Sequence, residues 1–189
     1  MQDSSVHRLS YYNYLTDEKL LSGIWNLLCK YSNQFVPPLW SRKSTLQDNL
    51  NDALNSKDLA EMPYEYFEDL KKQSVILATD IEGQVIGFMS FQLNFWPSAL
   101  CNYQHDESLP VYVTTVIIDE AYRKIGLATE FYKEIFKHDP SNKIISVRTW
   151  STNYSHIKLL NRLDFIEAYR IENDRGQGLD TIYYIRKCT

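Results

Sequence analysis

Apolar residues recur along the chain with two periodicities, one typical of strands and the other of helices. Short runs rich in Val, Ile, Tyr and Phe predict strands at residues 6–12, 74–78, 85–93, 111–118, 144–150, 165–171 and 181–185. Apolar residues spaced three or four apart predict helices at residues 16–31, 44–54, 63–72, 125–136 and 154–163. This order predicts an α/β fold, a mixed sheet with helices over its faces.

Residues with special backbone preferences mark several element ends. Thr16, followed by Asp17 and Glu18, is expected to cap the first helix, and Pro63 is expected to open the third. The segment 80–83 ends in glycine and predicts a hairpin turn between two apolar strands. Residues 98–109 are polar and predict a loop.

Composition narrows the class of protein. The 189 residues fit a single domain, and 20 Lys and Arg against 24 Asp and Glu give a net charge of −4, which argues against a nucleic acid partner. The three cysteines, Cys29, Cys101 and Cys188, form no CxxC pair, so neither a disulfide framework nor a metal site is expected. No apolar run approaches the roughly 20 residues that span a bilayer. We therefore expect a cytoplasmic protein with no membrane partner.

One segment, residues 111–136, has the character of an anion site. A strand runs into an acidic turn, and Arg123, Lys124, Gly126, Ala128 and Thr129 then open a helix. Backbone N–H groups at a helix start have no internal partners, and small side chains let an anion approach them. The same residues would also fit a plain turn with solvated charges. The spacing matches neither a Walker loop nor a dinucleotide fingerprint.

Two linked motifs resemble the GNAT N-acetyltransferase superfamily. Residues 111–136 are similar to its motif A, a strand followed by R/Q-x-x-G-x-G/A and a helix. Residues 153–165, NYSHIKLLNRLDF, resemble its next signature, N-x-x-A-x-x-L-Y-x-x-x-G-F, at the spacing that the family shows. The resemblance covers residues 74–187. It implies one GNAT domain over residues 1–189, with a helical acceptor-side region at residues 13–73 and a CoA-binding core at residues 74–187.

The resemblance implies a mostly antiparallel sheet that splays between strands 111–118 and 144–150, with acetyl-CoA as the cosubstrate in the gap and no metal. Asn153 would contact the pantetheine arm or cap the last helix. The other residues implied to bind the cofactor lie along the central strand and the phosphate turn: Val116, Ile117, Ile118, Arg123, Lys124, Ile125, Gly126, Leu127, Ala128 and Thr129.

The match departs from the family at positions that matter for the chemistry. Leu160 stands where many members carry the tyrosine that protonates the departing thiolate, and Asp164 stands where glycine usually precedes Phe165. We therefore consider His156, Tyr112 and Tyr154 as catalytic candidates. His156 lies one helical turn before Leu160, and strand alternation places Tyr112 on one face with Thr114. Each of the three could instead be a packing or surface residue.

The acceptor has to be inferred from weaker signals. Residues 13–73 combine aromatic and acidic side chains that suit a cationic amine, or that simply pack the helices and face water. They are Trp25, Phe35, Trp40, Tyr64, Tyr66, Phe67, Glu61, Glu65, Glu68 and Asp69. The loop residues His105, Asp106 and Glu107 could overhang the acceptor site or be solvated. Arg148 would pair with a carboxylate of the protein or recognise an acidic group on the substrate.

These observations predict an N-acetyltransferase that moves the acetyl group of acetyl-CoA to a primary amine of a small molecule by direct attack in a ternary complex. A protein or peptide N-acetyltransferase is the alternative within the enzyme class. A non-catalytic acyl-CoA-binding sensor is a third reading, and the absence of a tyrosine at position 160 favours it. A homodimer is compatible with the family, although no residue demands one.

Overall fold

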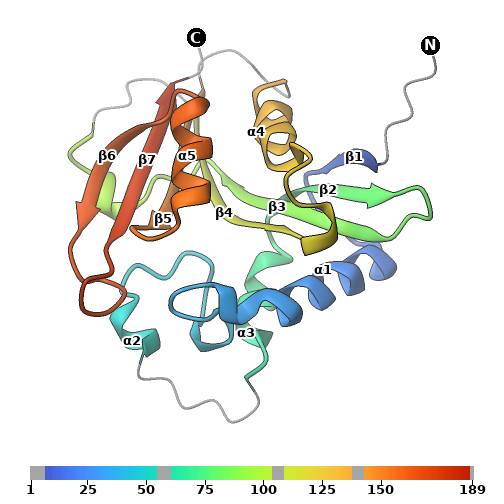
Figure 1. Ribbon diagram of the computed structural model, residues 1–189, viewed down its shortest axis with the longest axis horizontal. Helices are drawn as coiled ribbons and strands as arrows, with labels where there is room; N and C mark the ends of the chain where they lie inside the picture. The colour runs from blue at the N-terminus through green and yellow to red at the C-terminus, as the bar shows by residue number, and fades with distance from the viewer. Residues whose placement is uncertain (1–6, 55–60, 104–108, 138–142, 188–189) are drawn as a thin grey trace.

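Seven strands form one sheet in the order β1-β2-β3-β4-β5-β7-β6, and helices cover both of its faces (Figure 1). The computed structural model describes residues 7–54, 61–103, 109–137 and 143–187. The strands are β1 (His7–Tyr12), β2 (Ser74–Asp80), β3 (Val85–Leu93), β4 (Leu109–Ile118), β5 (Lys143–Trp150), β6 (Ile166–Ile171) and β7 (Thr181–Lys187). This architecture confirms the predicted fold class.

The middle of the sheet is splayed. β4 and β5 are parallel, whereas the other neighbouring strands pair antiparallel. Pairing between β4 and β5 ends at Val113 and Val147, although β4 continues to Ile118 and β5 to Trp150. The gap predicted between these two strands is therefore present.

A β-bulge at Thr114 lies where the two strands part. Ser90 on β3 pairs with Thr115 and the next residue, Phe91, pairs with Val113, which leaves Thr114 as the extra residue. The Thr114 Oγ1 lies 2.8 Å from Ser90 Oγ and 2.6 Å from Gln73 Oε1, to which it donates. Because a bulge bends its strand and increases the local twist, it turns the end of β4 away from β5.

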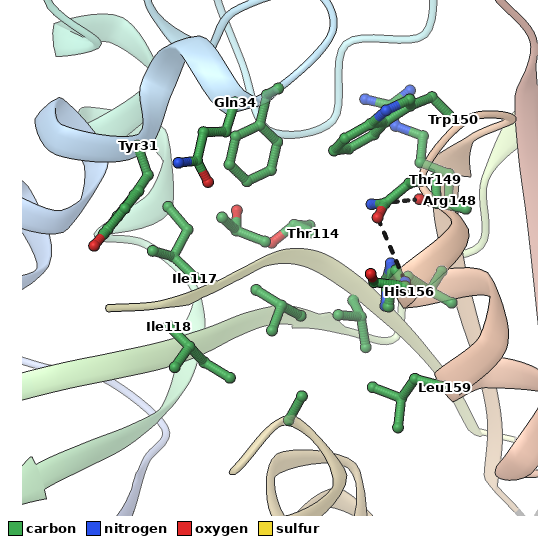
Figure 2. A pocket seen from close by; sticks show the side chains of 18 of the residues that line it. Tyr31, Gln34, Thr114, Ile117, Ile118, Arg148, Thr149, Trp150, His156 and Leu159 are labelled. Carbon is green, nitrogen blue, oxygen red and sulfur yellow. Dashed lines mark hydrogen bonds between the residues drawn. The ribbon is translucent and has the colours of Figure 1, made fainter. Parts of the chain in front are cut away.

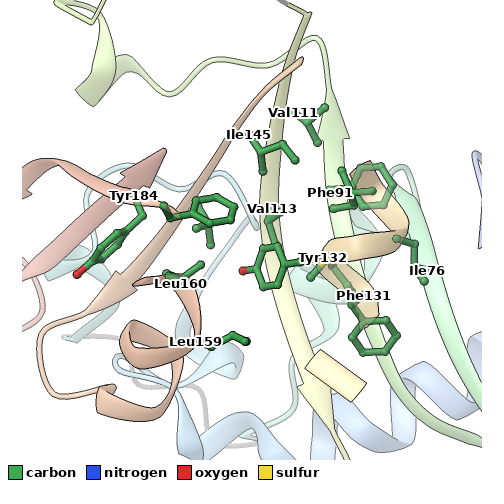
Figure 3. Packing of buried hydrophobic residues seen from close by; sticks show 14 of the residues in the cluster. Ile76, Phe91, Val111, Val113, Phe131, Tyr132, Ile145, Leu159, Leu160 and Tyr184 are labelled. Atoms are coloured by element: carbon green, nitrogen blue, oxygen red, sulfur yellow. The ribbon is translucent and has the colours of Figure 1, made fainter. Parts of the chain in front are cut away.

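The face of the sheet under α4 (Leu127–Lys137) and α5 (Tyr154–Arg162) holds the largest apolar cluster (Figure 3). Both helices have one apolar stripe, and in α4 it contributes Phe131 and Tyr132, which are fully buried. In α5, Leu159 and Leu160 pack against the same cluster. These helices are thereby fixed on either side of the splay.

The opposite face is covered by α1 (Glu18–Tyr31), α3 (Tyr64–Leu70) and short 3₁₀ turns (Figure 1). Ile24 and Leu28 of α1 are completely buried against Leu77 and Phe88 of the sheet. The 3₁₀ turns on this side are η1 (Ser32–Gln34), η2 (Leu39–Ser41) and η3 (Ser98–Leu100), whereas η4 (Glu120–Tyr122) packs its Tyr122 against the α4 face. Among the described helices, none has the length and the apolar character needed to span a membrane.

The prediction of a helix at residues 44–54 is wrong over most of that range, since only α2 (Asn51–Leu54) is helical. Ser44 Oγ and Thr45 N and Oγ1 all donate to Asp69 Oδ2, at 2.9, 3.0 and 2.7 Å. Side-chain and backbone groups used in this way hold the segment in a non-helical conformation.

Two helix starts also differ from the prediction. Asp17, rather than Thr16, caps α1, because its Oδ1 accepts from Leu20 N at 3.0 Å. α4 begins at Leu127 instead of residue 125, because Lys124 and Gly126 have φ values of 68° and 97° that do not continue into a helix. The predicted loop at residues 98–109 contains η3, and its His105, Asp106 and Glu107 lie outside the described residues.

Gly23 marks the point where α1 approaches β3. A Cβ at Gly23 would lie 2.6 Å from Val85 Cγ2. Gly23→Ala should therefore lower the free energy of unfolding by about 1–2 kcal/mol, because overpacking outweighs the better helix propensity of alanine. In a Val85→Gly background, which removes both the Val85 Cγ2 and the Val85 Cβ that lies 2.7 Å from the added atom, the same change should be neutral or stabilising. Urea denaturation of the four proteins checks this, and equal effects in both backgrounds would contradict the contact.

Candidate functional site

A cleft of about 420 Å³ occupies the splay between β4 and β5 (Figure 2). Its walls come from the diverging strands, from α5 and from the segment that follows α1. The lining residues are Tyr31, Gln34, Phe35, Arg42, Val113, Thr114, Thr115, Val116, Ile117, Ile118, Arg123, Ala128, Val147, Arg148, Thr149, Trp150, Asn153, Ser155, His156, Leu159 and Arg175. Residues from β4, β5 and α5 thus meet residues from distant loops.

The end of β4 offers free backbone groups to the cleft. Val116, Ile117 and Ile118 pair with β3 on one edge, but they have no β5 partner on the other. The side chains of Val116 and Ile118 pack towards the α4 face, whereas Ile117 is buried on the α1 face. An extended chain could therefore hydrogen-bond along this edge as a further strand would.

The turn into α4 presents a run of unsatisfied donors. In the described part of the chain, the backbone N–H groups of residues 124–129 make no backbone hydrogen bond. The first bond of the helix runs from Glu130 N to Gly126 O. A Cβ built on Gly126 would meet nothing within 4 Å. Unpaired N–H groups, the helix dipole and open space are the features that suit an anion.

Arg123 lies at the edge of this turn and is already engaged. Its Nε donates to Ile118 O at 2.9 Å, and its Nη2 donates to Gln34 Oε1 at 2.9 Å. The guanidinium lies 4.8 Å from the centre of the Tyr31 ring. These contacts join the turn before α4, residues 123–126, to the end of α1.

Asn153 caps α5 and lines the cleft. Its Oδ1 accepts from His156 N at 3.4 Å, and its Nδ2 donates to Thr149 Oγ1 at 3.1 Å. The capping role predicted for Asn153 is therefore visible, and its side chain also ties α5 to the end of β5.

His156 faces the cleft from the first turn of α5 (Figure 2). Its Nε2 lies 2.8 Å from the hydroxyl of Tyr132, which is buried in α4. Burial lowers the pKa of His156 to about 4, and burial also raises the pKa of Tyr132 well above its ordinary value. At neutral pH the imidazole is therefore uncharged and paired with a neutral phenol.

Most of the aromatic and acidic residues of the acceptor-side region lie away from the cleft. Trp25 stacks on Tyr64 at 4.9 Å between ring centres and contacts Phe67 at 5.2 Å, which fixes α3 to α1. Asp69 accepts hydrogen bonds from the 44–45 segment. Of the ten predicted side chains, Phe35 lines the cleft. Helix packing accounts for the rest of the aromatics better than recognition of a cation does.

Comparisons with known proteins address the family. The profile of the acetyltransferase (GNAT) family matches residues 43–165, well over half of the chain. The chain belongs to the GNAT acetyltransferase family. No curated protein sequence matches it.

Solved structures similar to this GNAT chain have low sequence identity but nearly complete coverage. A candidate acetyltransferase from Acinetobacter baylyi ADP1 is 20% identical, with a TM-score of 0.61, and the match covers 97% of this chain and 94% of that one. Arabidopsis thaliana NAA60 with a bisubstrate analogue is 16% identical, with a TM-score of 0.62 and coverage of 95% and 98%. A candidate phosphinothricin N-acetyltransferase is 17% identical, with a TM-score of 0.61 and coverage of 96% and 99%.

A further structure of NAA60 holds acetyl-CoA. At these identities the likeness is one of fold. No group of three or more His, Cys, Asp or Glu side chains in the described ranges is arranged to hold a metal ion.

Two of the three catalytic candidates lie outside the cleft of this GNAT domain. Tyr112 is 2% exposed and packs with Tyr183 and Phe95 on the sheet face opposite α4. Burial raises the pKa of its phenol well above the ordinary value. Tyr154 is 73% exposed at the start of α5. The structure therefore brings only His156 of this set to the cleft.

Position 160, where the family often carries tyrosine, does not face the cleft. Leu160 is completely buried among the apolar residues between α5 and the sheet, whereas its neighbour Leu159 lines the cleft. The loss of a hydroxyl at position 160 therefore removes nothing from the cleft wall seen here.

Besides Arg123, three arginines line the cleft, and only one of them was identified from the sequence. Arg148 was identified from its strand, but Arg42 and Arg175 come from loops that lack any motif. Trp150, the last residue of β5, and Gln34 of η1 were also missed, because neither belongs to a motif. Only the fold brings the segments that follow η2 and β6 to the end of β5.

The low pKa of His156 predicts a pH-dependent contribution to stability. The unfolded chain binds a proton at this residue between pH 6.5 and 4 that the folded chain does not. The wild-type protein should therefore lose roughly 3 kcal/mol relative to His156→Gln as the pH falls from 7 to 4. Urea unfolding of both proteins across this range measures the difference, and a constant difference would show that His156 is not desolvated.

Proposed function

We propose that this protein is an N-acetyltransferase that uses acetyl-CoA and acetylates the primary amine of a small molecule. The observation that carries the proposal is that one cleft is lined by the β4 edge at Val116 to Ile118, which β5 does not pair, and by Ala128 at the start of α4, where the N–H groups of residues 124–129 make no backbone hydrogen bond among the described residues. An apolar strand edge that leads to an anion site suits a ligand with an amide-containing arm and a pyrophosphate.

The residues present fit that cofactor. The backbone edge from Val116 to Ile118 that β5 leaves unpaired would hold the pantetheine arm, and the N–H groups of residues 124–129 would hold the pyrophosphate. Lys124 is exposed and adds positive charge beside the turn. When bound, acetyl-CoA supplies the activated acyl group. The fold likeness to NAA60, which has been solved with acetyl-CoA, supports this choice of donor.

A contact across the cleft favours a small acceptor. The ring of Phe35, after η1, lies 5.8 Å from the ring of Trp150 at the end of β5, centre to centre. These residues belong to opposite walls and both line the cleft. Because they meet, the cleft is bridged at the end away from α4, which is the acceptor end in this proposal. A cleft closed in this way suits a compact amine better than an extended peptide.

A peptide acceptor is the second candidate, and the likeness to NAA60 with its bisubstrate analogue supports it. The two candidate acceptors require different positions of the Phe35 and Trp150 rings. A peptide would need the rings to separate, whereas a small amine would fit beneath them.

Transfer to an amine requires a neutral nucleophile, a polarised carbonyl and a proton for the leaving thiolate. His156 is uncharged at neutral pH because its pKa is about 4, so it can accept a hydrogen bond but holds no proton to donate as an imidazolium. His156 therefore stays a candidate for orienting a reacting group.

The direct test measures thiol release from acetyl-CoA against a panel of small amines and N-terminal peptides, with CoA binding followed by calorimetry on the same sample. We expect CoA to bind and a small primary amine to give amine-dependent release. Faster release with peptides would favour the second candidate. Binding without release for every acceptor would indicate a non-catalytic acyl-CoA sensor, and no CoA binding would overturn the proposal.

Gly126→Glu tests the position of the pyrophosphate site. The new carboxylate would enter the open space beside the free N–H groups, and like charges brought together cost several kcal/mol, so CoA affinity should fall by at least about a hundredfold. Gly83→Glu is the matched control, since Gly83 also has a positive φ, 77°, and open space around its Cβ. Normal CoA binding by a folded Gly126→Glu protein would contradict the placement.

A further inference from the structure

Three arginines from different parts of the chain meet at the acceptor end of the cleft. Arg42 follows η2, Arg148 lies on β5, and Arg175 lies in the turn between β6 and β7. Arg42 is 5% exposed and Arg175 is 2% exposed, yet both line the cleft. Buried guanidinium groups are costly unless a partner compensates their charge.

The described part of the protein supplies little compensation. None of the three guanidinium groups forms an ion pair with a carboxylate among the described residues. The buried Asp174 acts on Arg42 and Arg175 at longer range, and its Oδ2 accepts a hydrogen bond from Thr181. Burial, together with repulsion from the other arginines, lowers the pKa of Arg42 to about 10 and that of Arg175 to about 9. All three remain charged at neutral pH.

The hydrogen bonds of these groups leave donors unused. Arg42 donates Nε and Nη2 to Pro37 O at 3.1 and 2.7 Å, and Arg175 donates Nε to Thr181 Oγ1 and Nη1 to Val36 O. Nη1 of Arg42 and Nη2 of Arg175 have no partner among the described residues. Both residues line the cleft, and neither nitrogen is among the fully buried unpartnered atoms of the described residues.

Aromatic rings hold two of the arginines in place. The Arg42 guanidinium lies 5.7 Å from the centre of the Phe35 ring, and that of Arg175 lies 5.7 Å from the Trp150 ring. Since Phe35 and Trp150 also contact each other, the two cations and two rings form one assembly. The positive groups are thus ordered before a ligand binds.

We infer that Arg42, Arg148 and Arg175 recognise an anionic group, a carboxylate or a phosphate, on the same small molecule that carries the acceptor amine. This rests on the proposed function, since it names the chemical class of its acceptor. Guanidinium groups with free N–H donors match the geometry of both anions. The anionic group sits between the arginines, and the amine points along the cleft towards β4.

The same charges act on the amine. A positive environment disfavours the ammonium form and therefore lowers the pKa of a bound amine. Acetyl transfer needs that neutral form, and His156 is a weak base. The arginines thus hold the acceptor by its anion and favour the reactive state of its nitrogen.

The test compares matched amines, each amino acid against its amide and each aminoalkyl phosphate against its aminoalkyl alcohol. Acetyl-CoA-dependent thiol release gives kcat/KM per concentration of neutral amine. We expect one anionic series to be preferred by about ten- to a hundredfold, because its charged hydrogen bonds have no counterpart in the neutral series. Which series is preferred identifies the anion.

Arg148→Gln should remove most of that preference by raising KM for the anionic amine more than for its neutral counterpart. Arg148 is the most informative position because its Nη2 donates to Thr45 O over a long 3.4 Å, and its guanidinium also hydrogen-bonds the side chain of Tyr183. Arg8→Gln, an exposed residue on β1, is the control that should change neither. Calorimetry of the N-acetylated products against their neutral analogues gives a second readout that needs no turnover.

The outcomes separate this inference from the proposed function. Turnover with equal or greater preference for the neutral amines, or an unchanged preference in Arg148→Gln, overturns the anion site and leaves the acetyltransferase in place. Arginine-dependent binding of the anionic products without turnover supports the anion site and contradicts the proposed acetyltransferase activity. The absence of turnover together with the absence of product binding overturns the anion site and the proposed function.

Discussion

The parting of β4 from β5 after Val113 and Val147 is the constraint on which the rest of the site depends. If the two strands stayed paired, the backbone groups from Val116 to Ile118 would bond to β5, and there would be no cleft. The bulge at Thr114, held by Ser90 and Gln73, changes the direction of β4 at this point. The sheet keeps its stability because the remaining strand pairs and the apolar layers on both faces are intact.

The cleft that results has two polar ends and an apolar middle. One end is the start of α4, where free N–H groups and the helix dipole attract an anion. The other end holds Arg42, Arg148 and Arg175. Side chains such as Val147 and Leu159 line the space between them. This arrangement suits two ligands that each bring negative charge and meet in the middle of the cleft.

Packing also decided which side chains are available for chemistry. Tyr112 and Leu160 are on motifs that point to the site, yet both are used by the core. His156 reaches the cleft but is desolvated and paired with Tyr132, which keeps it neutral. The same positions of the family motif can therefore serve packing in one chain and catalysis in another.

The sequence by itself determined the order of strands and helices from residue 74 onwards, because hydrophobic periodicity encodes it, and the resemblance of two motifs to the family implied the splay. It did not determine the segment at residues 44–50, where bonds to Asp69 override local helix preference. It also could not reveal the arginine cluster. Arg42, Arg148 and Arg175 are far apart in the chain, and only the tertiary structure brings their loops and strand together. Long-range contacts of this kind leave no periodic signal in a single sequence.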